Sequence, residues 1–305
     1  MSTGVYAKTA GDLIRDALRA ATISGISLPI EPDDFAQGFT ALNDILLNFQ
    51  TKKVHIWSQT EALLPLNTGQ QKYVFGVDHA FSDYVYTTAL AASAGATTLN
   101  VLSTVGMTNG DFIGIELSDF TRQWTTLTIV DGDTVTLAAP LTLSVNNLAS
   151  VYTYTTGIDQ PIRIESMRYA ANQTANEIST SNTARDTYFN QSVKDADGST
   201  NMWYFSRQLD KGELYIWPVA DNCMNILRFT FLKPQYIPED QSENILIPPE
   251  WYIALKFKLA ADLAVTYNVD ANKQMMLEQK AAQYLQDAIQ SDDDNASFQF
   301  YPSYR

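Results

Sequence analysis

Apolar positions recur with a helical period at both ends of this chain and with a period of two in between. The helical spacing predicts four helices, over about residues 10–22, 31–53, 248–267 and 271–290. Between the second and third of these helices, short alternating runs are separated by turn residues, which is typical of strands. The pattern therefore predicts an α+β fold in which the helical ends of the chain enclose a long β insertion.

Residues at the expected helix starts support these boundaries. Thr9 is placed to cap the first helix, with Asp12 three residues later as a short capping-box partner. Pro32 suits the first position of the second helix, where its missing N–H costs nothing. Asp270 is a suitable N-cap for the fourth helix. Pro248-Pro249-Glu250 starts the third helix, so each of the four helices carries a start signal of its own.

Two apolar stripes at helical spacing predict how the chain ends pack. The stripe of the second helix consists of Phe35, Phe39, Leu42, Leu46 and Phe49. The stripe of the third helix consists of Leu255, Leu259 and Leu263. An amphipathic helix buries its apolar stripe against a partner. We therefore expect residues 1–57 and 245–290 to form one discontinuous helical domain.

The intervening region, residues 58–244, is predicted to be antiparallel β structure. Within it, residues 87–156 contain five or more short strands with almost no helical pattern, which indicates a compact small barrel or sandwich. The sequence Asp131-Gly132 predicts a tight hairpin, because glycine tolerates positive φ. Residues 171–200, rich in Asn, Thr, Ser and Gln, are predicted to form a long polar loop exposed for contacts.

Composition limits the classes of partner. The chain has 305 residues with 34 acidic and 20 basic side chains, and its formal net charge is −14. Because binding to phosphates relies on Lys and Arg, this charge argues against a general affinity for nucleic acid. Lys52, Lys53 and Arg185 are the candidates for a local basic patch. No stretch is long and apolar enough for a membrane span, and Cys223 is expected to be a buried apolar group.

Motifs for catalysis or metal binding are absent from the sequence. Its two histidines, His55 and His79, lack partners at ligand-like spacings. Residues 131–133 and 292–294 contain clustered acids that could attract calcium, but a hairpin turn and a solvated linker explain them more simply. A glycosidase-type pair of carboxylates stays open, since an acidic chain contains many such pairs. We expect a protein without enzymatic activity, cofactor or metal.

Aromatic residues near residue 300 give the clearest interaction signal. Residues 291–305 begin with an acidic linker and then carry the candidate partner-binding residues Phe298, Phe300, Tyr301, Tyr304 and Arg305. These residues follow neither a helical nor a strand period, so they cannot form a core by themselves. Large aromatics and Arg are the residues that most often anchor an interface. We predict a docking tail, with packing onto its own subunit as the alternative.

Segments at both ends of the chain resemble a known family. The run TAGDLIRDALR at residues 9–19, followed by Glu31-Pro32 and the helix with Leu42, Asp44 and Leu46, resembles head-to-tail adaptor proteins of short-tailed bacteriophages. These are the packaged-DNA-stabilising head-completion proteins and the tail tubular A proteins. The order of the third and fourth helices and Tyr301-Pro302-Ser303 are also similar. The match covers roughly the two helical ends, and the β region has no counterpart in the shortest members.

This resemblance implies a structural virion protein without catalytic turnover. Such a protein would form a ring, expected to be a dodecamer, beneath the portal protein and would extend the DNA channel. It would retain packaged DNA, let double-stranded DNA pass during ejection without specific binding, and support the tail nozzle and tail fibres. The implied location is the neck of the virion, with assembly in the host cytoplasm.

Two other classes of function stay open at this point. The β region could be an adhesin or glycan-binding module, with the helices as its oligomerisation stalk; Trp124 and Trp203 would then stack on sugars. Core packing is the commoner role of such residues. An enzyme that acts on cell-wall glycan is the third possibility.

Overall fold

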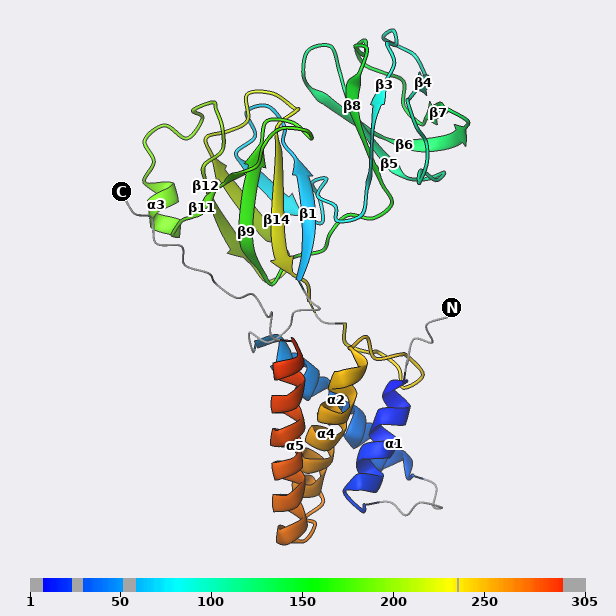
Figure 1. Cartoon of the computed structure of the whole chain (residues 1–305), viewed down its shortest axis with the longest axis vertical. Coiled ribbons are helices and arrows are strands. Elements are labelled where there is room, and N and C mark those ends of the chain that lie inside the picture. The colour runs from blue at the N-terminus through cyan, green and yellow to red at the C-terminus, as the bar shows by residue number, and fades with distance from the viewer. Residues whose placement is uncertain (1–7, 24–29, 52–58, 235, 293–305) are drawn as a thin grey trace, which may run out of the picture. The chain divides into compact units, whose positions relative to one another are not determined.

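The computed structural model describes residues 8–23, 30–51, 59–234 and 236–292, and it divides the chain into two compact units (Figure 1). The helical unit contains Met1–Ser58 and Gln235–Arg305, and the β unit contains Gln59–Pro234. Along the sequence, helices at the two ends of the chain flank a large antiparallel β region, so the predicted α+β fold class is confirmed. Among the described residues, no helix has the length and apolar character needed to cross a membrane.

Four helices form the helical unit. They are α1 (Ala10–Ala20), α2 (Pro32–Thr51), α4 (Pro249–Thr266) and α5 (Ala271–Asp292). The Thr9 hydroxyl accepts a hydrogen bond from the Asp12 backbone N–H at 3.1 Å, so this N-cap prediction is confirmed. The Asp12 carboxylate bonds instead to Arg15, at 2.9 Å. The Asp270 carboxylate accepts from the Asn272 N–H at 3.1 Å and caps α5.

A single apolar core joins these helices. The predicted stripes meet in it, because α2 and α4 pack together and both also contact α1. Leu42 and Leu46 from α2 and Leu255, Leu259 and Leu263 from α4 are completely buried. Phe35 and Phe39, at the start of the α2 stripe, are only partly buried. Helix α5 packs on α4, on the side away from α1 (Figure 1).

Two four-stranded sheets form one lobe of the β unit. The first has the order β1-β14-β9-β10, and the second has the order β11-β12-β13-β2. Their bounds are β1 (Gln59–Pro65), β14 (Ile226–Leu232), β9 (Arg163–Ala170), β10 (Ile178–Ser179), β11 (Ser181–Asn182), β12 (Met202–Arg207), β13 (Gly212–Trp217) and β2 (Lys72–Phe75). Both sheets contribute to one core that includes Tyr73, Trp203, Leu214 and Phe229. The lobe therefore holds strands from the start and the end of the insertion.

The second lobe is a six-stranded sheet with its own core. Its order is β3-β8-β5-β6-β7-β4, all antiparallel. The bounds are β3 (Val85–Ala89), β8 (Ala149–Tyr154), β5 (Phe112–Glu116), β6 (Arg122–Asp131), β7 (Thr134–Leu137) and β4 (Thr98–Asn100). Gly132, at φ 55°, turns the chain between β6 and β7, as the Asp-Gly sequence predicts.

An aromatic cluster connects the two lobes. Phe81 is completely buried and stacks on Tyr154 with ring centroids 4.6 Å apart. Leu63 and Ile226 of the first sheet and Tyr152 of the six-stranded sheet share this cluster. Because these side chains come from both lobes, the cluster ties the lobes together.

Residues 171–200 do not form a continuous loop, which corrects the sequence-based expectation. They contain the short strands β10 and β11 and the helix α3 (Arg185–Phe189). Tyr188 of α3 is buried, and its hydroxyl donates to the Ile216 carbonyl at 3.1 Å. These elements were not predicted because the segment is mostly polar and each element contributes only a few apolar residues to a core.

Candidate functional site

The predicted docking residues cannot be placed in the fold. Phe298, Phe300, Tyr301, Tyr304 and Arg305 lie outside the described residues, as do residues 293 and 294 of the acidic linker. The partner-binding role of this segment stays a prediction. The surfaces of the described residues therefore supply the candidate site.

An apolar groove of about 490 Å³ opens on the helical unit. One wall is the first part of α2 together with Ile30 just before it, and the other wall is the loop that leads toward α4. The lining residues are Ile30, Pro32, Phe35, Ala36, Phe39, Glu239, Asp240 and Gln241. Ligand sites are typically concave, mostly apolar and a few hundred cubic ångströms in volume. The groove therefore has the size and character of a docking site for apolar side chains.

Two glycines allow α1 to pack closely against both walls of the groove. The Gly11 N–H donates to the Gln241 carbonyl at 2.8 Å, and a Cβ on Gly11 would lie 3.0 Å from that oxygen and 3.3 Å from the Phe35 ring. On α2, a Cβ on Gly38 would lie 2.5 Å from the Ile14 side chain. A larger residue at Gly11 would press against the loop and Phe35, and one at Gly38 would push α1 away from α2.

Hydrogen bonds fix the loop wall. The Ala10 N–H donates to the Glu243 carbonyl at 2.9 Å. The Glu243 carboxylate accepts from the Glu239 N–H at 3.0 Å and from the Tyr236 hydroxyl, and the latter bond raises the pKa of Tyr236. Hydrogen bonds from Ser242 lower the pKa of the Asp240 carboxyl. The rim of the groove is therefore anionic at neutral pH.

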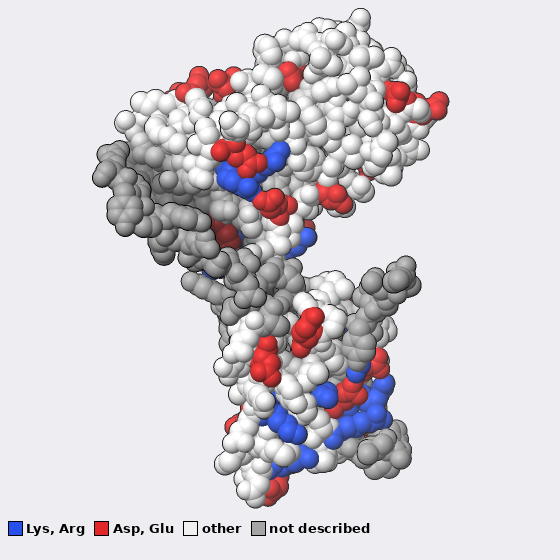
Figure 2. Space-filling view, viewed as in Figure 1, with Lys and Arg blue, Asp and Glu red and all other residues white. Residues whose placement is uncertain are grey.

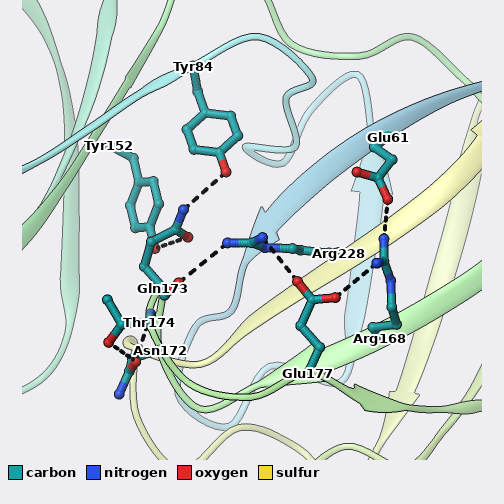
Figure 3. Close-up of polar contacts among 9 residues, drawn as sticks. All are labelled: Glu61, Tyr84, Tyr152, Arg168, Asn172, Gln173, Thr174, Glu177 and Arg228. Atoms are coloured by element: carbon teal, nitrogen blue, oxygen red, sulfur yellow. Dashed lines mark hydrogen bonds and ion pairs between the residues drawn. The ribbon is translucent and has the colours of Figure 1, made fainter.

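The β unit carries a second polar feature, a network of two arginines and two glutamates (Figure 3). Arg168 on β9 and Arg228 on β14 are directly opposite in the strand register. Glu177 bridges them, 2.9 Å from Arg168 and 3.0 Å from Arg228, and Glu61 also pairs with Arg168. The network neutralises its own charges across three strands, which is the arrangement of a structural brace.

Amide groups extend this network toward the second lobe (Figure 3). The Gln173 side chain donates to the Tyr84 hydroxyl at 3.2 Å and accepts from the Tyr152 hydroxyl at 3.3 Å. Its backbone carbonyl accepts from Arg228 at 3.5 Å. These hydrogen bonds join the two lobes.

On the visible face of the β unit, acidic and basic side chains touch over the region of β9 and β14, and most of the remaining surface is uncharged (Figure 2).

The tryptophans proposed for sugar stacking are engaged in packing. Trp203 is only 2% exposed and belongs to the core of the first lobe, so its ring face is not available, which corrects that expectation. Trp124 stacks on His79 with ring centroids 3.9 Å apart. Burial lowers the pKa of His79, with Asp78 opposing the shift, and its Nδ1 lies 2.5 Å from the Tyr154 hydroxyl.

The described residues contain neither a cluster of metal ligands nor a reactive thiol. No group of three or more His, Cys, Asp or Glu side chains is arranged there to hold a metal ion. Cys223 is completely buried, as predicted, and burial raises its thiol pKa to about 11. A thiol in this state is a poor nucleophile at neutral pH.

The groove escaped sequence-based prediction. Phe35 and Phe39 read as core residues because they continue the stripe of Leu42 and Leu46. Residues 239–241, which form the facing wall, are far away in the sequence and carry no motif.

Comparison with known proteins identifies no family. No protein-family model and no curated protein matches the chain. Among solved structures, 25% of this chain is similar to the tailspike protein gp49 from Pseudomonas phage LKA1, with 24% identity and a TM-score of 0.22, and the chain spans 15% of that protein's length. VP17, a capsid protein of bacteriophage P23-77, is similar over 61% of this chain and 77% of its own length, at 12% identity and a TM-score of 0.12. Both are bacteriophage structural proteins, but TM-scores this low do not indicate a shared fold.

Proposed function

We propose that this protein is a head-to-tail adaptor of a short-tailed bacteriophage. It assembles as a ring beneath the portal protein, extends the DNA channel, retains packaged DNA and supports the tail nozzle and fibres. It does this without catalytic turnover. The role combines the family resemblance of the chain ends with the architecture of the helical unit.

One observation carries this proposal: helices from both ends of the chain share a single core. Leu42 on α2 and Leu259 on α4 are completely buried in that core, although the whole β unit separates them in sequence. The helices that carry most of the resemblance to the adaptor family are the helices that form this module. An insertion is tolerated where the interrupted chain ends meet at a surface. The β unit is then an elaboration that leaves the assembly module intact.

The acidic charge is compatible with a channel that releases DNA. At a net charge of −14, phosphate groups meet few opposing cations, so DNA would pass with little retention. Of the candidate basic residues, Arg185 lies on α3, where its guanidinium group is 5.2 Å from the Phe189 ring centroid. Lys52 and Lys53 lie outside the described residues.

Native mass spectrometry of the full chain tests the proposal. The protein is measured alone and after mixing with the portal protein encoded by the same genome, and complexes are imaged by electron microscopy. We expect closed rings of about twelve subunits, formed alone or on the portal. A stable trimer that does not bind the portal protein would favour the adhesin instead. A monomer that never binds the portal would exclude the adaptor role.

A further inference from the structure

We propose that the apolar groove on the helical unit binds the aromatic tail, residues 298–305, of a second copy of this chain. This inference deepens the proposed function, because it names a contact that joins successive subunits of the ring. It rests on three features of the molecule: the groove, the chemistry of the tail and the length of α5.

The groove presents apolar surface that the described helices leave uncovered. Phe35 and Phe39 continue the α2 stripe but are only partly buried, whereas Leu42 and Leu46 farther along it are completely buried. Ile30, Pro32 and Ala36 complete the apolar wall. A volume of about 490 Å³ accommodates two or three large side chains, and burying each would contribute roughly 1.5–3 kcal/mol.

The tail carries side chains that complement this groove. Four aromatic residues, Phe298, Phe300, Tyr301 and Tyr304, occur within eight positions. Arg305 is the only Lys or Arg after Lys280. The groove rim holds Glu239 and Asp240, and the Glu239 carboxylate forms no ion pair with another described residue. An aromatic segment that ends in a cation therefore matches an apolar groove with an anionic rim.

The length of α5 favours a groove on another subunit. The Tyr267 hydroxyl donates to Asp34 at 2.7 Å, so the turn before α5 lies beside the first turn of α2, at one end of the groove. The 22 residues of α5 then carry the chain about 33 Å away. Residues 293–297 bring Phe298 back by about 20 Å at most. To enter its own groove at the Asp34 end, the tail would have to run back along α5 fully extended, with Phe298 still short of that end. A tail from another subunit is free of this constraint.

A tail on one surface and a groove on another form a heterologous contact. Such contacts repeat from subunit to subunit and close into a ring when the rotation permits. Because the acceptor groove and the donor tail are on the same chain, every subunit in a closed ring would use both. The assembly would then need no additional protein to join neighbours.

Disulfide trapping between two variants, each with one introduced cysteine, tests the inference. Ala36→Cys places a thiol on the exposed groove wall, and Gln299→Cys places one in the tail. The native Cys223 is completely buried and stays as it is. Under mild oxidation we expect crosslinked dimers when the two variants are mixed and none when either is oxidised alone. Met275→Cys, on an exposed part of α5, replaces Ala36→Cys as the matched control and should give no crosslink with Gln299→Cys.

Loss of an anchor should reduce the trapped product. Adding Phe39→Ala to the groove variant should lower the yield of crosslinked dimer at least about tenfold, as expected for an interface hot spot. Circular dichroism of that variant verifies that the helices persist. An unchanged yield in a folded Phe39→Ala protein would overturn the proposed groove.

A double variant distinguishes a second copy from the same chain. Ala36→Cys with Gln299→Cys in one chain should give a ladder of linked subunits that ends at the ring. A crosslinked monomer alone, or no crosslink at all, would overturn the inference. If rings form on the portal without any crosslink, the tail contact is wrong and the adaptor proposal stands. If crosslinked pairs form but no ring closes, the tail contact stands and the adaptor proposal fails.

Discussion

The helical and β units stabilise themselves in different ways. The helical unit has one apolar core, shared by helices that come from opposite ends of the chain. The β unit divides its apolar residues among separate clusters and connects them with aromatic rings and a charged brace. A mutation at the centre of a single core destabilises the whole unit, whereas a mutation in one of several clusters can destabilise that cluster alone. The comparison predicts different consequences for mutations in the two units.

The largest effect is expected at the centre of the helical core. Leu259→Ala should lower the free energy of unfolding of this unit by about 2–5 kcal/mol, because it leaves a cavity at a completely buried site. Urea unfolding monitored by circular dichroism measures the change. Val265→Ala on the same helix is the matched control, since Val265 is 57% exposed, and its effect should be within about 0.5 kcal/mol.

The same variant tests whether the units are independent. In NMR spectra of Leu259→Ala, we expect resonances of the helical unit to change widely while those of the β unit stay in place. Equal loss of resonances from both units would show that they unfold together, and the contrast between them would be wrong.

A smaller effect is expected at the charged brace of the β unit. Glu177→Gln removes the carboxylate between Arg168 and Arg228 and leaves two guanidinium groups opposite each other on neighbouring strands. We expect a loss of about 1–2 kcal/mol in stability, reduced for the partial exposure of these side chains. Glu165→Gln is the control, because Glu165 pairs only with Arg163 on its own strand. Equal losses for both variants would mean that the brace adds nothing to an ordinary surface pair.

The smallest effect concerns pH. Burial lowers the pKa of His79, so the folded protein favours the neutral imidazole and the unfolded chain binds the proton more readily. Stability should therefore be fully present above about pH 6.5 and should fall as the pH drops toward the lowered pKa. His79→Phe, which keeps a ring beside Trp124, should flatten this part of the profile of melting temperature against pH. An unaltered profile would assign the pH dependence to other groups.

Helices were predictable from local signals, and the groove was not. Thr9, Pro32 and Asp270 mark helix starts because capping depends on the few residues around each end. The alternation of apolar and polar positions also predicted β structure across residues 58–244. The pairing of β1 with β14 was not predicted, because it joins residues 59–65 to residues 226–232. The groove depends on a similar long-range approach of Gln241 to Gly11, for which the sequence holds no local cue.

Trp203 and helix α3 were also determined by long-range contacts. Trp203 was a candidate for sugar stacking only under the glycan-binding alternative, and the meeting of two sheets buries it. Helix α3 was missed because its five residues include a single buried anchor, Tyr188. Short elements that rely on tertiary contacts leave little periodicity for a sequence to show.

Replacing residues 59–234 by a flexible Gly/Ser linker of about 15 residues tests most directly whether the chain ends form a self-sufficient module. Because the helical unit keeps its own core in such a protein, we expect a strongly helical circular dichroism spectrum. We also expect a cooperative unfolding transition that Leu259→Ala shifts to lower denaturant. A spectrum without helix, or a transition that does not respond to Leu259→Ala, would contradict the claim that the two ends of the chain fold as one module.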